Sequence, residues 1–84
     1  MGEQKIKSDG VIHIGKNIRT ARLSAGIGQT ELVRLVQLTG TPLTRETLVK
    51  FERGLQHIQA SQLRAIRDAL KTSYDELLRP KETD

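Results

Sequence analysis

The polar side chains of residues 43–54 have types and a spacing that suit recognition of another molecule. Arg45, Glu46 and Lys50 fall on one side of a helix with 3.6 residues per turn, near its start. A short helix with an exposed, partly cationic N-terminal half suits insertion into the major groove of DNA. The alternative is an ordinary amphipathic helix of a small core, whose outer face is simply solvated.

The remaining residues of this segment are those that a helix needs to hold that polar side outward. Thr44 is a good N-cap, because its hydroxyl can accept a hydrogen bond from an orphaned backbone N–H. Leu43 and Leu48 occupy the two positions of a hydrophobic staple across this cap. Leu48 and Phe51, three residues apart, predict a buried stripe, and Gly54 suits the left-handed residue that follows a helix.

Length and composition limit the classes of protein to consider. A chain of 84 residues has room for one domain with a modest core, which a dimer interface would help to stabilise. With no Cys and only two His, we expect no disulfide, metal site or other cofactor. No apolar run approaches the roughly 20 residues that cross a bilayer, and the N-terminus lacks a signal-peptide core. We therefore expect a cytoplasmic protein.

The basic residues are concentrated in the middle of the chain. The formal net charge is +4, from 14 basic and 10 acidic residues. Residues 16–53 carry seven basic and three acidic side chains, whereas residues 75–84 carry two basic and four acidic ones. This distribution permits binding to a polyanion without requiring it. Phe51 and Tyr74 are the only aromatic residues, which disfavours binding of single-stranded nucleic acid by base stacking.

Residues 1–13 are expected to form a flexible tail, because most of them are polar and two are Gly. This tail is either a basic arm that touches DNA or an ordinary disordered terminus. The apolar run from Val11 to Ile14 has two interpretations that periodicity does not separate. It suits one added strand, such as a strand that pairs across a dimer, or the beginning of the first helix.

Apolar residues at helical spacing predict the first two helices. Ile14, Ile18, Ala21 and Ala25 follow one another at intervals of four, three and four residues, and Gly26 ends that helix. The second helix begins at about residue 29. Its apolar side is expected to contain Leu32, Leu35, Val36 and Leu38.

Two more helices are predicted after a connecting loop at residues 55–60. Ser61 is the expected N-cap of the fourth helix and Ser73 that of the fifth, with Glu76 at its capping-box position. The apolar residues of the fourth helix are Leu63, Ile66 and Leu70. Five short helices predict an all-α domain over residues 14–79, followed by a C-terminal tail at residues 80–84.

These segments, in this order, resemble the lambda and 434 repressor and Cro family of helix-turn-helix proteins, also called the XRE-type family. The similar segments are residues 18–22 with Gly26, 29–32, 44–54, 61–66 and 73–77. The strongest is TRETLVKFERG at residues 44–54, which is close to the family's recognition-helix pattern ending in Glu-Arg-Gly. The resemblance implies a compact, lambda-repressor-like five-helix domain that binds double-stranded DNA as a homodimer.

The resemblance also implies roles for individual residues. The residues that would face base edges are Thr44, Arg45, Glu46 and Lys50. Arg45 would bind O6 and N7 of a guanine together, and Lys50 would also take guanine acceptors. Glu46 would accept from a cytosine amino group or repel phosphate in wrong registers. The residues implied in phosphate binding are Gln29, Gln56 and His57.

Two further sets of residues would support the domain. Arg22 and Glu52 match the family's internal ion pair between the first and third helices, a structural role. The family's dimer surface tends to involve the last helix, which here contributes Tyr74, Leu77 and Leu78. The apolar run at residues 11–14 is the rival dimer surface.

The sequence departs from the family pattern in two places. Gln29 and Glu52 are 23 positions apart, more than is usual in the family, so the turn between the second and third helices is lengthened within residues 37–42. Thr39 and Thr41 in this turn either touch phosphate or belong to a plain surface loop. Residues 55–59 contain no Lys or Arg, so we expect a shallow dependence of DNA binding on salt.

We therefore interpret the chain as a sequence-specific DNA-binding transcriptional regulator, a repressor, with residues 44–53 as its recognition helix. The alternative is an antitoxin-like or scaffold protein whose main role is to bind another protein. An enzyme is not expected, because no local motif arranges Ser, His and Asp. A small helical bundle also offers little concave volume, so no small-molecule ligand is expected.

Overall fold

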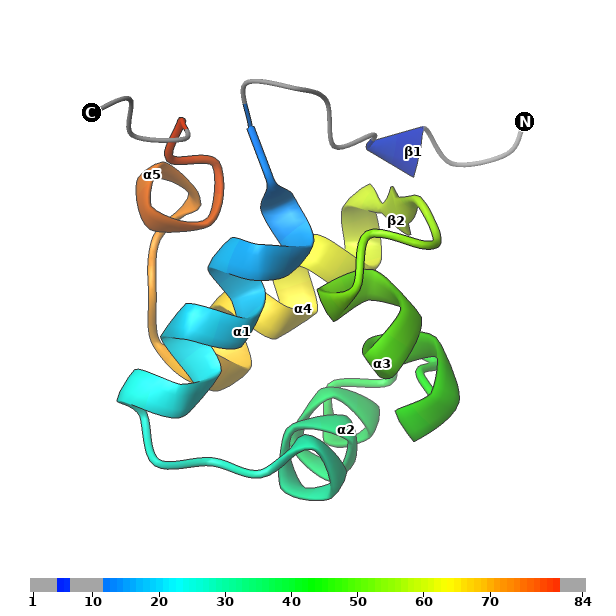
Figure 1. Ribbon diagram of the computed structural model, residues 1–84. Coiled ribbons are helices and arrows are strands. Elements are labelled where there is room, and N and C mark those ends of the chain that lie inside the picture. The colour runs from blue at the N-terminus through cyan, green and yellow to red at the C-terminus, as the bar shows by residue number, and fades with distance from the viewer. Residues whose placement is uncertain (1–4, 7–11, 81–84) are drawn as a thin grey trace.

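Packing between short helices organises the chain in the computed structural model, which describes residues 5–6 and 12–80 (Figure 1). In chain order the elements are β1 (Lys5–Ile6), α1 (Ile14–Ser24), α2 (Gln29–Leu38), α3 (Arg45–Glu52), β2 (Ile58–Gln59), α4 (Ala60–Leu70) and α5 (Tyr74–Leu77). The Cα radius of gyration is 11.9 Å, and a compact chain of this length is expected to have about 12 Å. The protein is therefore compact and mostly helical. None of the helices in the described ranges combines the length and apolar character needed to cross a bilayer.

The predicted N-terminal tail contains a short strand. Lys5–Ile6 pairs antiparallel with Ile58–Gln59, a segment that we predicted as loop. Ile12 forms a single antiparallel bridge with Pro80, and Ile14 already begins α1. The apolar run therefore leads into the first helix after one bridge. The rest of the two predicted tails, at residues 1–4, 7–11 and 81–84, lies outside the described residues.

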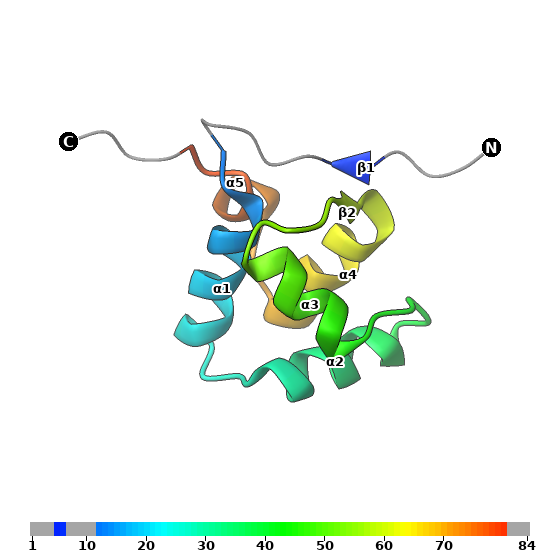
Figure 2. The same cartoon turned by 45° about the vertical axis from the view of Figure 1, so that its right-hand side comes forward.

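One apolar core lies between the helices. α1 contacts α3 and α5, and α2 contacts α3 and α4. Figure 2 shows α3 on the near side of the molecule, with α1 beside it and α2 below it. The buried apolar side chains are Ile14, Ile18, Leu32, Val33, Val36, Leu43, Leu48, Phe51, Ile58, Leu63, Ala65, Ile66, Leu70 and Leu77.

The predicted apolar faces differ from the observed ones at the ends of helices. Ala25 is exposed because it is the C-cap of α1 and lies beyond the last turn that packs on the core. Leu38 is 72% exposed because it is the last residue of α2. Leu35, one turn earlier on the same helix, is half-buried.

The fourth helix begins earlier than predicted. Its N-cap is Gln59, so Ser61 lies inside α4 rather than at its cap. The backbone N–H of Gln59 donates to Oε1 of Gln62 at 3.0 Å, which is one of the two bonds of a capping box. The predicted N-cap of α5 is confirmed, because Oγ of Ser73 accepts the backbone N–H of Glu76 at 3.2 Å.

Candidate functional site

α3 presents opposite sides to the core and to solvent. Leu48 is completely buried and Phe51 is 2% exposed, whereas Arg45, Glu46 and Lys50 are exposed. None of the three charged side chains forms an ion pair with another residue of the described ranges. The outer side of α3 therefore carries two cations and one acid whose hydrogen-bonding groups are open to a partner.

The ends of α3 are closed by the residues that the sequence indicated. Oγ1 of Thr44 accepts the backbone N–H of Thr47 at 3.1 Å and also lies 2.9 Å from Oγ1 of Thr47. Gly54 has φ +72°, and its N–H donates to the carbonyl oxygen of Phe51 at 3.0 Å. Because Thr44 is the N-cap of the helix and is itself exposed, it lies beside the charged residues of the first turn.

The turn between α2 and α3, at residues 39–44, is held by hydrogen bonds to α2. Oγ1 of Thr39 donates to the carbonyl oxygen of Val36 at 2.6 Å and lies 3.3 Å from Oγ1 of Thr41. Nε2 of Gln37 donates to the carbonyl oxygen of Leu43 at 2.8 Å. Leu43 is itself buried, so the residue that precedes the α3 cap is anchored on both its backbone and its side chain.

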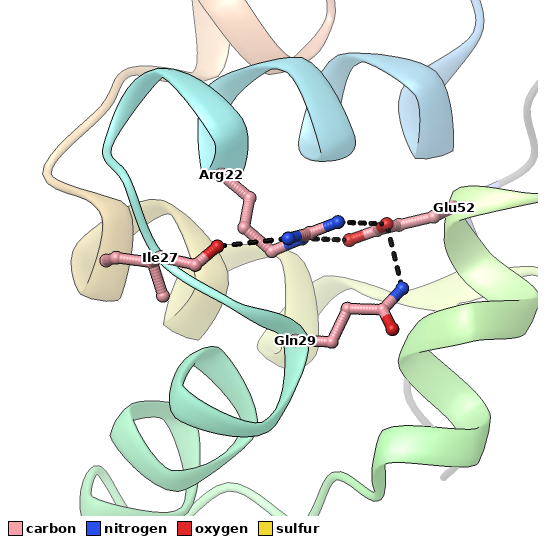
Figure 3. A network of polar contacts seen from close by, with 4 residues as sticks. All are labelled: Arg22, Ile27, Gln29 and Glu52. Atoms are coloured by element: carbon pink, nitrogen blue, oxygen red, sulfur yellow. Dashed lines mark hydrogen bonds and ion pairs between the residues drawn. The ribbon is translucent and has the colours of Figure 1, made fainter.

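A buried ion pair joins the end of α1 to the end of α3 (Figure 3). Nε and Nη2 of Arg22 donate to the two carboxylate oxygens of Glu52 at 2.7 and 2.9 Å, a bidentate geometry. Nη1 donates to the carbonyl oxygen of Ile27 at 3.0 Å. The side chains of Arg22 and Glu52 are only 9% and 3% exposed. The hydrogen bonds that Arg22 donates to Glu52 raise the pKa of Arg22 despite the opposing effect of burial, so the guanidinium remains charged up to strongly alkaline pH.

Gln29, a predicted phosphate-binding residue, belongs to the same network. Its Nε2 donates to Oε1 of Glu52 at 3.2 Å, which places the start of α2 against the end of α3 (Figure 3). Gln56 and His57, the other predicted phosphate-binding residues, are exposed in the segment between α3 and β2. The structure thus brings Gln29 to the end of α3, while Gln56 and His57 follow that end along the chain.

The predicted dimer residues of α5 differ in exposure. Tyr74 is 37% exposed, and the guanidinium carbon of Arg67 lies 4.4 Å from its ring centroid. Leu78 is half-buried. Leu77 is completely buried in the core, and its carbonyl oxygen accepts from Nδ2 of Asn17 at 2.9 Å. The assignment of Leu77 to a dimer interface is therefore wrong, because its side chain already packs inside its own chain.

One cationic group near α3 was not predicted as part of the site. Lys16 and Arg19 on α1 line the same hollow as Arg53, which directly follows α3. The helical spacing predicts that Lys16 and Arg19 face outward, but it contains no information about what lies opposite them. Gly15 is the one local signal, because a residue without a Cβ atom permits a close backbone approach.

Comparisons of this chain with protein-family models, with curated proteins and with solved structures give no match. The geometry of its own residues is therefore the basis for a functional interpretation.

Proposed function

We propose that this protein is a sequence-specific double-stranded DNA-binding protein, a helix-turn-helix transcriptional repressor with a lambda-repressor-like arrangement of its five helices. In this proposal α3 enters the major groove, and Thr44, Arg45, Glu46 and Lys50 face base edges. The observation that carries the proposal is the two-sided burial of α3. Leu48 and Phe51 anchor one side, while the charged side chains extend from the other.

The bonds at both ends of α3 support a reading role for this helix. Arg22 and Glu52 attach its last turn to α1, and the bond from Gln37 to Leu43 holds the chain just before its first turn. Side chains on a rigid element keep their geometry relative to a partner, so less entropy is lost when they bind. Discrimination between base pairs depends on such fixed geometry, and each good bidentate contact contributes about 1–3 kcal/mol.

The start of α2 offers a second contact with the duplex. A side-chain amide has two N–H donors, and Gln29 uses its amide nitrogen to reach Glu52. The second N–H of that amide, together with the first backbone N–H groups of α2, can donate to a phosphate oxygen. In the proposal Gln29, Gln56 and His57 position the domain on the backbone, and α3 reads the sequence.

We further propose that the protein binds as a homodimer, so that two copies of α3 reach successive major grooves on one face of the duplex. The expected operator is then a two-fold related sequence whose half-sites are centred about 34–36 Å apart. The proposal involves no cofactor, metal ion or catalytic step.

Selection of genomic DNA fragments by the purified protein tests this proposal. The bound fragments are sequenced, and a gel shift then compares an enriched duplex with a shuffled one of equal length at two salt concentrations. We expect the enriched duplex to have two-fold symmetry in its sequence. We also expect a shift that is selective for this duplex and that weakens as the salt concentration rises. The absence of any shift at low salt would contradict the proposal.

A second candidate function is that of an antitoxin-like or scaffold protein that binds another protein. Leu38 and Leu55 favour it, because these large apolar side chains are 72% and 65% exposed. The same experiment separates the two candidates. A protein-binding module without a DNA-binding role would give no selective shift. The exposed leucines alone do not decide between the two candidates, because single exposed leucines are also common on proteins that bind no other protein.

A further inference from the structure

A basic hollow of about 510 Å³ lies where the start of α1 meets the end of α3. Its lining includes three exposed cations, Lys16, Arg19 and Arg53, and one acid, Glu52. Both carboxylate oxygens of Glu52 are bonded to Arg22, which offsets its charge. None of the three cations forms an ion pair with a residue of the described ranges. The hollow therefore presents three positive charges and no uncompensated acid to solvent.

Gly15 explains why these cations lie together. A Cβ atom added at this position would be 1.7 Å from the carbonyl oxygen of Phe51 and 2.7 Å from its carbonyl carbon. The backbones of α1 and α3 thus touch at a point where only glycine fits. Lys16 and Arg19, three residues apart on α1, share one helical face next to this contact. Direct backbone packing holds that face beside Arg53.

The hollow continues the outward side of α3. Lys50 and Arg53 are three residues apart, so they are neighbours on one face. At 1.5 Å per residue, the distance along the helix from Arg45 to Arg53 is about 12 Å. The major groove of DNA is also about 12 Å wide. If α3 spans the groove with its start on base edges, its end lies near the wall of the groove, where the phosphates run.

We propose that Lys16, Arg19 and Arg53 form a clamp for the phosphate backbone of the duplex that α3 reads. The proposal rests on the function proposed above and adds a second helix, α1, to the interface. The chain after α3 has no Lys or Arg at residues 55–59, so the clamp supplies charge that this loop lacks. As a consequence the salt dependence of binding is steeper than the loop alone predicts, by about 0.9 in log–log slope for each phosphate neutralised.

The test measures binding of Lys16→Gln, Arg19→Gln and the double variant by fluorescence anisotropy, over a series of salt concentrations. Each protein is titrated against the enriched duplex and against a shuffled duplex of equal length. Arg64→Gln is the matched control, because Arg64 is also exposed and lines a different groove beside the α2–α3 turn. Thermal melting of every variant checks the fold, which these exposed substitutions are expected to leave unchanged.

We expect each single substitution to weaken binding to both duplexes by the same factor and to lower the salt slope by about one, and the double variant to lower it by about two. The control keeps the parent's affinity and slope. A double variant with the parent's slope, or with a loss confined to the enriched duplex, would overturn the clamp and leave the DNA-binding function standing. A parent that binds neither duplex would overturn both.

Discussion

Arg22 and Glu52 carry opposite charges that are almost completely removed from water, with their hydrogen-bonding groups matched to each other, to Ile27 and to Gln29. Burying such a pair is costly in itself, and its attraction offsets that cost only while both partners are present. The value of this pair to the protein is therefore geometric: it ties α1, the start of α2 and the end of α3 to one point.

Glu52→Gln tests this view of the ion pair. We expect the free energy of unfolding to fall by about 3–5 kcal/mol, because the substitution leaves the Arg22 guanidinium buried without a counter-charge. Urea denaturation followed by circular dichroism measures the change. Glu46→Gln, an exposed position of the same helix, serves as the control and should alter stability by less than about 0.5 kcal/mol. Equal stability of the two variants would contradict the structural role of the pair.

Arg45→Ala separates recognition from folding. Arg45 is exposed in the first turn of α3, so its removal should leave the melting temperature unchanged. Loss of a bidentate contact with a guanine should lower the affinity for the enriched duplex at least tenfold, since such a contact contributes about 1–3 kcal/mol. Binding to the shuffled duplex should change much less. Unchanged affinity for the enriched duplex would remove Arg45 from the interface.

At the scale of elements, α3 is a helix of eight residues held in place mainly by two apolar side chains. A helix this short is marginal in isolation, so its stability comes from packing against α1 and α2. Leu48 on α3 and Gly15 on α1 both contribute to this packing, so a substitution on either helix can test it.

Leu48→Ala tests the anchored side of α3. Leu48 is completely buried, and truncation should lower the free energy of unfolding by about 2–5 kcal/mol through lost burial and the cavity left behind. Lys50→Ala, at an exposed position two residues later, should have little effect on denaturation. If Leu48→Ala melted at the temperature of the parent, the assignment of the two sides of α3 would be wrong.

Gly15→Ala and Gly28→Ser test the contact between α1 and α3 from the α1 side. A Cβ at Gly15 meets the backbone of Phe51, which has little freedom to move, whereas no atom lies within 4 Å of a Cβ at Gly28. We expect Gly15→Ala to destabilise the fold by about 1–3 kcal/mol, as overpacking does. Gly28→Ser should raise stability by a few tenths of a kcal/mol as a better N-cap of α2. Thermal denaturation compares the two, and a neutral Gly15→Ala would contradict the tight backbone contact.

At the scale of the whole molecule, the proposed function requires one small domain to provide both a DNA-reading surface and a dimer contact. α3 and the basic hollow lie together at one part of the surface, through the packing of α1 on α3. Tyr74 lies on α5, which packs against α1. The charged side chains of the proposed reading surface lie on a different helix, α3. The proposed dimer contact and the proposed DNA contact are thus formed by different elements, so each can be altered separately.

Tyr74→Ala tests the dimer contact. Truncation of a central interface aromatic often costs about 2 kcal/mol or more, so we expect the dimer association constant to fall by at least tenfold. Sedimentation equilibrium measures it, and the melting temperature of the monomer should change little because Tyr74 is part-exposed. Leu55→Ala, which removes another exposed apolar side chain, is the matched control. Association as strong as the parent's would place the dimer surface elsewhere, or show that the protein does not dimerise through α5.

Local sequence determined the helices and most of their ends. The spacing of Ile14 and Ile18 on α1, the caps at Thr44 and Ser73 and the left-handed Gly54 depend on residues within about four positions of one another, so they are readable from the chain itself. The resemblance of residues 44–54 to a known pattern added the expectation of an Arg22–Glu52 pair. The same local rules failed at some helix ends. Ala25 and Leu38 are exposed because they lie at the ends of α1 and α2, beyond the turns that pack on the core. The N-cap of α4 is Gln59 rather than Ser61.

Tertiary packing alone decided which distant residues meet. It placed Leu77 in the core rather than on a partner, paired Lys5–Ile6 with Ile58–Gln59, and put Gly15 on the backbone of Phe51. The strand pairing and the contact at Gly15 each join residues more than thirty positions apart in the chain. Their formation depends on the angles and distances between packed elements, which many side chains set together and no short stretch of sequence contains. For that reason the charged side of α3 was foreseeable, whereas the cations that α1 places beside it were not.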